Sequence, residues 1–185
     1  MNVIDYVNAL SIDELRARLT AYMTSDKRLT TYPIAIEVRA NDSAKACCRY
    51  DVLFLDENGN ATTVVFPDRF SRLIYIYTLL HPKGFQRRSV ANNNYRSLCC
   101  LFDLLYFKDS AALFKTINNA ESYQKGHFLS QYIAQSRKAV RNALPLADEF
   151  IIDRPQNHNG KVLIPFVAAG GKVTLDTQLT AFINL

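Results

Sequence analysis

The sequence LSQYIAQSRKAVRNAL, residues 129–144, carries the pattern on which we base the fold prediction. Its apolar side chains recur at the three- and four-residue spacing of an α-helix that packs one face against a core. Tyr132 stands at the edge of this apolar stripe, and Pro145 ends the pattern because proline cannot continue a helix. We therefore predict a basic helix over about residues 128–144. Its buried stripe is formed by Leu129, Ile133, Val140, Ala143 and Leu144.

The opposite face of the basic helix is rich in amide and cationic side chains. No Asp or Glu occurs from residue 127 to residue 144. Asn and Gln can read adenine edges, whereas Arg and Lys read guanine or bind phosphate. A solvated polar face is an equally good interpretation of the helix taken alone. The two polar stripes are Gln131, Gln135, Lys138 and Asn142, and beside them Ser130, Arg137 and Arg141.

Charge is distributed unevenly along the 185 residues, whose net charge is +5. Residues 1–66 hold seven Lys and Arg against nine Asp and Glu, and residues 67–185 hold fifteen against eight. A basic region suits a polyanionic partner because cationic side chains release counterions when they neutralise phosphates. A solvated basic face accounts for the composition equally well.

An antiparallel sheet is predicted over residues 34–66. Apolar and polar residues alternate from Ile34 to Arg39, and two further strands are expected over 49–55 and 61–66. The segment that joins them contains Asn58-Gly59, a pair typical of hairpin turns. With an N-terminal helix, residues 1–66 make one predicted domain.

Helices alternate with few strands in the remaining residues, 67–185, which form the second predicted domain with a C-terminal extension. Helices are expected over 68–81 and 94–107, ahead of the basic helix. Strands over 150–153 and 161–166 would form a hairpin, and a third strand over 172–175 follows Gly170-Gly171, a predicted tight hairpin turn. The predicted class is α+β, with a small antiparallel sheet followed by three helices and a C-terminal β-hairpin.

The order of these elements resembles the winged-helix output domain of bacterial response regulators, over about residues 64–166. In that family a strand leads into a first helix, a second helix supports a third that enters the major groove, and a hairpin wing follows. Residues 129–144 look like the third helix, residues 77–84 resemble the end of the first, and residues 150–166 would be the wing. The chain departs from the family in its long link, residues 108–126, and in the Ile164-Pro165-Phe166 ending of the wing.

The resemblance implies a DNA-binding protein, a transcriptional regulator with double-stranded DNA as partner. The N-terminal part would then make a homodimer or sense a signal. The alternative is a non-enzymatic interaction or assembly module on the same fold. The residues that the resemblance assigns to DNA are Gln131, Gln135, Arg137, Lys138, Arg141 and Asn142 on the helix, Arg154 and Lys161 near the wing tip, and Lys83, Arg87, Arg88 and Arg96 toward phosphate.

Patterns typical of catalysis are missing from the sequence. None of the three His residues belongs to a metal-binding spacing, and there is no Gly-x-Ser-x-Gly or phosphate-cradling glycine loop. We therefore expect neither an enzyme nor a bound metal or cofactor. The N-terminus does not resemble a signal peptide and no apolar stretch is long enough for a membrane span, so a cytoplasmic protein is expected, with no membrane partner.

Overall fold

The computed structural model describes residue 11 and residues 33–41, 48–86, 95–106, 122–145, 147–153 and 159–183, without the side chains of residues 95, 122–128 and 183. The chain divides into two compact units, residues 1–32 and 33–185. The predicted N-terminal helix lies outside the described residues. All the described helices and strands belong to the second unit, and the boundary expected between residues 66 and 67 falls inside it.

This unit is α+β, as the sequence predicts. Its elements in chain order are β1 (Ala35–Ala40), β2 (Tyr50–Leu55), β3 (Ala61–Thr63), α3 (Arg69–Leu79), β4 (Phe85–Gln86), α5 (Tyr95–Tyr106), α7 (Ser122–Ala143), the 3₁₀-helix η1 (Asp148–Phe150), β5 (Lys161–Val162), α8 (Pro165–Ala168), β6 (Lys172–Leu175) and α9 (Thr177–Ile183).

The larger sheet has the strand order β3-β2-β1-β6. The two antiparallel pairings, β1 with β2 and β2 with β3, confirm the antiparallel sheet expected over residues 34–66, although the third strand ends at Thr63 and not at residue 66. The turn between β2 and β3 is closed by Asp56, whose carboxylate accepts the backbone N–H groups of Asn58 and Asn60, each at 2.8 Å. The sheet is not purely antiparallel, however, because β6 pairs with β1 in parallel.

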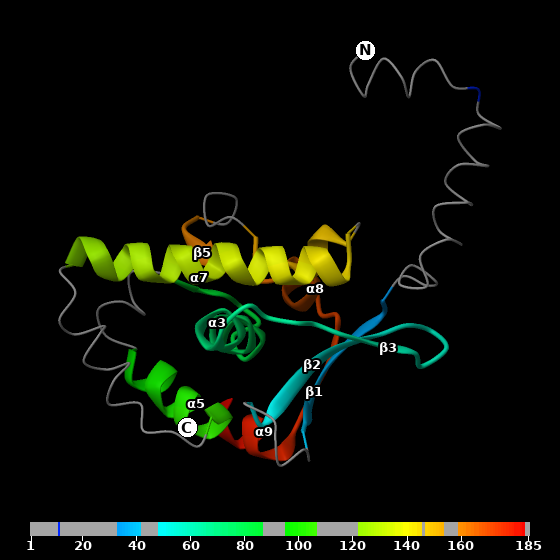
Figure 1. Cartoon of the computed structure of the whole chain (residues 1–185), viewed down its shortest axis with the longest axis horizontal. Coiled ribbons are helices and arrows are strands. Elements are labelled where there is room, and N and C mark those ends of the chain that lie inside the picture. Colours follow the sequence, from blue (N-terminus) through cyan, green and yellow to red (C-terminus); the bar gives the residue numbers. More distant parts are fainter. Residues whose placement is uncertain are drawn as a thin grey trace. The chain divides into compact units, whose positions relative to one another are not determined.

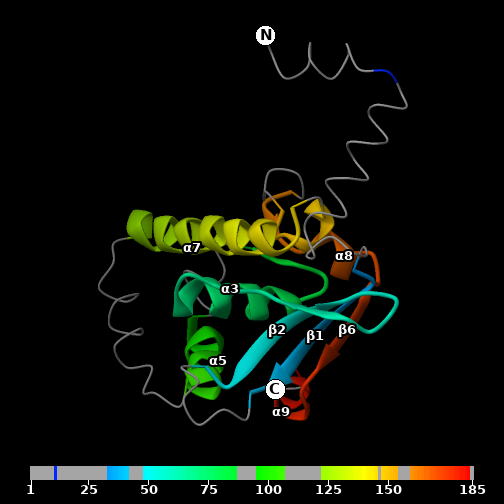
Figure 2. The same ribbon diagram turned by 45° about the vertical axis from the view of Figure 1, so that its right-hand side comes forward.

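The helix α3 lies between α7 and α5, and the sheet lies beside it (Figure 1 and Figure 2). Its N-terminus is capped by Asp68, whose Oδ1 accepts the N–H groups of Phe70 and Ser71 at 2.8 and 2.9 Å. Satisfying these otherwise unpaired donors stabilises the first turn, and the helix begins close to residue 68, as predicted. Eight of the eleven residues of α3 are buried, so α3 is a central helix of the core.

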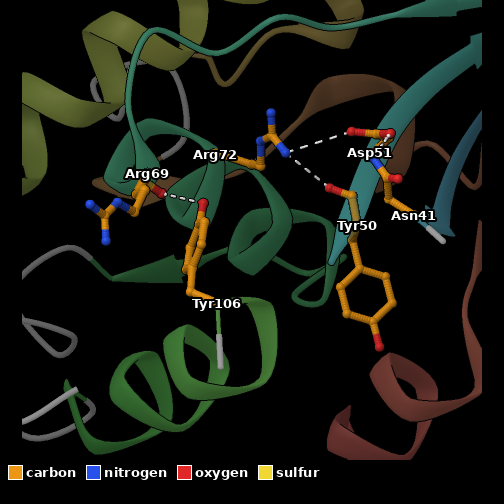
Figure 3. Close-up of polar contacts among 6 residues, drawn as sticks. All are labelled: Asn41, Tyr50, Asp51, Arg69, Arg72 and Tyr106. Carbon is orange, nitrogen blue, oxygen red and sulfur yellow. Dashed lines mark hydrogen bonds and ion pairs between the residues drawn. The ribbon is translucent and has the colours of Figure 1, made fainter. Parts of the chain in front are cut away.

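Polar contacts join α3 to the sheet and to α5 (Figure 3). The guanidinium of Arg72 donates to the Tyr50 carbonyl oxygen at 3.1 Å and lies 3.6 Å from the Asp51 carboxylate. The Tyr106 hydroxyl of α5 donates to the Arg69 carbonyl oxygen at 2.9 Å. These contacts fix the first turns of α3 against two neighbouring elements.

The hairpin predicted over residues 150–166 forms only in part. Residues 148–150 are a 3₁₀-helix and not the start of a strand, and β5 pairs with β4. The two arms of the predicted hairpin still meet, because the Asp153 N–H donates to the Leu163 carbonyl oxygen at 2.9 Å. The second arm ends early because Pro165 occupies the first turn of α8, where a proline is favourable.

The sequence predicts that the turn at Gly170-Gly171 joins two strands of one hairpin, and the structure shows that it does not. It leads from α8 into β6, whose partner is β1 and not β5. Gly171 lies against Phe166, and a Cβ there would fall 2.5 Å from the ring. The glycine is thus required for close packing between α8 and the strand that comes after it.

We predict that Gly84→Ala destabilises the fold more than Gly59→Ala. Both glycines have a positive φ, +70° and +78°, which costs an alanine about 1–2 kcal/mol. A Cβ at residue 84 would also lie 2.9 Å from the Val162 carbonyl oxygen, whereas none of the described atoms lies within 4 Å of one at residue 59. Urea unfolding measures the difference, and equal losses would contradict the packing of β4 against β5.

Tyr75→Phe is expected to reduce the free energy of unfolding by about 1–3 kcal/mol, because a buried carbonyl loses its hydrogen bond. The Tyr75 hydroxyl donates to the Phe150 carbonyl oxygen at 2.7 Å, and burial raises the pKa of this tyrosine well above its ordinary value. Tyr50→Phe is the control, since its hydroxyl is only part-buried. A loss no larger than that of the control would show that the bond does not hold α3 to this segment.

Candidate functional site

The surface of α7 that faces away from α3 carries a stripe of exposed residues, most of them polar. We call it the outward stripe and define it by its exposed residues Gln131, Ala134, Lys138, Arg141 and Asn142. An α-helix turns 100° per residue, so these positions fall within a sector of about 100° around the helix axis. Four of the six helix residues predicted to contact DNA therefore share one exposed surface.

The other two predicted contact residues on α7, Gln135 and Arg137, are half-buried. The expected alignment of Gln135 with Gln131 is inexact because a spacing of four residues turns the helix by 400°, which displaces Gln135 about 40° toward the core. Its Oε1 atom is buried. Arg137 lies at the opposite border of the outward stripe.

The inner face of α7 packs as the sequence predicts. Leu129, Ile133, Val140 and Leu144 are buried in the main core, although Ala143 is only half-buried. Tyr132 at the edge of this face contacts the Phe70 ring of α3, with 5.0 Å between the ring centroids. Burial, and then the negative charge of Asp68, raise the pKa of the Tyr132 hydroxyl. The apolar contacts with α3 therefore set which side of α7 is exposed.

An acidic residue that the sequence pattern does not reveal lies at one end of the outward stripe. The Arg141 Nε donates to Asp148 Oδ1 at 3.2 Å, and the two side chains are 49% and 73% exposed. The two residues are seven apart and a helix end lies between them, so no rule for pairs within one helix could have found this contact. The Ala147 N–H donates to the Leu144 carbonyl oxygen, and Asp148 follows directly at the start of η1.

Two further predicted cations, Lys161 and Lys83, lie at or next to the β4–β5 ladder. Lys161, predicted near the wing tip, is exposed on β5 and pairs in register with Gln86. Its Nζ donates to the Lys83 carbonyl oxygen at 3.5 Å, and Lys83 itself is exposed. Arg96 is exposed on another element, α5. Arg87, Arg88 and Arg154 lie outside the described residues.

Other kinds of site find little support in the part of the chain that the structure describes. No group of three or more His, Cys, Asp or Glu residues there could hold a metal ion. His81 lies just after α3, where its Nδ1 is 2.7 Å from the Tyr77 carbonyl oxygen and its ring packs on the Tyr77 ring. None of the described helices combines the length and hydropathy needed to span a membrane.

A scan of the chain against protein-family models, a search of curated proteins and a search of solved structures each found no match.

Proposed function

We propose that this protein binds double-stranded DNA through the outward stripe of α7 and acts as a transcriptional regulator. The observation that carries the proposal is the exposure of Lys138, Arg141 and Asn142 on one side of a helix whose other side is anchored in the core. A helix held in this way can enter the major groove with its polar side chains toward the bases.

The order and pairing of the neighbouring elements support a winged-helix-like arrangement. α3, α5 and α7 would be its three helices, with β4 between the first two. β4 pairs with β5, and the segment after α7 contacts Leu163, just beyond β5. The two-stranded β4–β5 ladder and this contact support residues 150–166 as the wing.

The charges at the surface support a phosphate-rich partner. α7 has no Asp or Glu in its 22 residues, and Lys83 and Lys161 add exposed cations at the β4–β5 ladder. Cationic side chains on α7 and beside the β4–β5 ladder would bind DNA phosphates on either side of the major groove. Amides such as Asn142 could read base edges.

Replacing Lys138 and Arg141 together by Ala should weaken binding to a mixed-sequence duplex at least about tenfold at low salt. If both side chains meet phosphates, the slope of log K against log salt should become less steep by about 1.8. Fluorescence anisotropy with a labelled duplex, at several salt concentrations, measures both quantities.

The control is Arg39→Ala with Lys172→Ala, which removes the same charge from exposed positions on β1 and β6. It should leave affinity close to that of the unchanged protein. Equal losses in the two double variants would show only a general effect of net charge. No duplex binding at all, with a concentration-dependent oligomer in light scattering, would favour the assembly module instead.

A further inference from the structure

Asp148 is an acidic residue that lies against the outward stripe, and its position is set by packing. It begins the η1 helix, which ends at the fully buried Phe150. The Phe150 ring contacts Phe54 of β2 and stacks on Phe166 of α8, with 5.4 and 4.3 Å between ring centroids. Its carbonyl oxygen also accepts the Tyr75 hydroxyl. The backbone two residues after Asp148 is therefore held by contacts with β2, α8 and α3.

The carboxylate contacts one particular part of the Arg141 side chain. Asp148 Oδ1 accepts from Nε, at 3.2 Å. A guanidinium has five N–H groups in a rigid plane, and the edge formed by Nη1 and Nη2 is distinct from the N–H of Nε. A bond at Nε thus orients the plane while that edge can still donate two parallel hydrogen bonds to a pair of acceptors.

We propose that Asp148 is a positioning residue that holds Arg141 ready to donate its Nη1–Nη2 edge to paired acceptor atoms of DNA. Guanine O6 and N7 are one such pair, and two phosphate oxygens are another. A long exposed side chain loses rotamer freedom when it binds, and an Arg141 that is already oriented loses less of it. The inference rests on the proposed function.

The opposite role for Asp148 is electrostatic competition, in which its carboxylate repels phosphate and occupies Arg141. The two roles predict opposite effects for Asp148→Asn, a substitution that keeps the shape and removes the charge. Competition predicts tighter binding when the carboxylate is lost, and positioning predicts weaker binding once the general effect of charge is subtracted.

The test compares Asp148→Asn with Glu149→Gln, which makes the same charge change one residue away. In the described part of the chain, the ion pair of Arg141 is with Asp148 and not with Glu149. We expect Asp148→Asn to bind a mixed-sequence duplex about threefold more weakly than Glu149→Gln, as suits an exposed pair. The difference in affinity between the two variants should disappear when each substitution is made separately in an Arg141→Ala chain.

Selection from a pool of random duplexes, applied to each variant, tells the two acceptors apart. If Arg141 binds guanine, Asp148→Asn loses affinity only for duplexes that carry guanine at one position. The preference for guanine at that position is then weaker in both Asp148→Asn and Arg141→Ala. With phosphate as partner, the loss is uniform across sequences, and the salt slope of Asp148→Asn is shallower by about 0.9 than that of Glu149→Gln.

Binding by Asp148→Asn that equals or exceeds that of Glu149→Gln overturns the positioning role. The proposed function survives that result as long as Lys138→Ala still weakens binding. A chain that binds no duplex, whichever residue stands at 148, overturns both proposals. Because the Arg141–Asp148 pair is exposed, Asp148→Asn should leave the midpoint temperature of thermal unfolding nearly unchanged. A loss of binding then cannot be attributed to loss of the fold.

Discussion

The burial of α3 is the constraint on which the arrangement of this unit depends. Eight of its eleven residues are buried, including Tyr75 and Tyr77, and from Leu73 to Leu79 no residue faces water. Its hydroxyl groups must then find partners, since a buried polar group without a hydrogen bond is costly. Tyr75 bonds the Phe150 carbonyl oxygen, and the Tyr77 hydroxyl lies 3.1 Å from Ser97 Oγ of α5. The direction of each bond fixes where a neighbouring element lies.

The outward stripe of α7 is a consequence of that burial. Apolar residues of α7 join the same core as α3, and the cations on the helix must point away because a charge is expensive to bury without a partner. The rotation of α7 about its axis is thereby settled. The half-burial of Gln135 and the exposure of Asn142 both follow from this rotation.

Local sequence signals predict the elements well and their partners less well. Asp68 marks a helix start and Asn58-Gly59 a turn, since in both cases the side chain or the backbone acts on its immediate neighbours. The pairing of β6 with β1 joins residues more than a hundred positions apart, and nothing in residues 172–175 specifies that partner. The same limit explains why the hairpin predicted at Gly170-Gly171 is wrong.

The candidate site, too, is predicted where it depends on local sequence and missed where it depends on distant contacts. Helical spacing is sufficient to place Lys138, Arg141 and Asn142 on an exposed face. It cannot reveal Asp148, because the contact with Arg141 depends on how the chain turns after the helix ends. Pro165 does signal the end of the second arm of the predicted hairpin, yet the apolar pattern of residues 161–166 favours a strand that runs through it.

Stability does not explain the composition of the outward stripe. An exposed helix face gains a few tenths of a kcal/mol from each pair of opposite charges spaced four residues apart, and acids are therefore common there. α7 has no acid along its whole length, so it forgoes that gain within the helix. The Asp148 carboxylate, which approaches the stripe, comes from outside the helix and contacts Arg141. Packing leaves such exposed positions free to vary, so neither packing nor pairing within the helix determines their bias toward cations and amides.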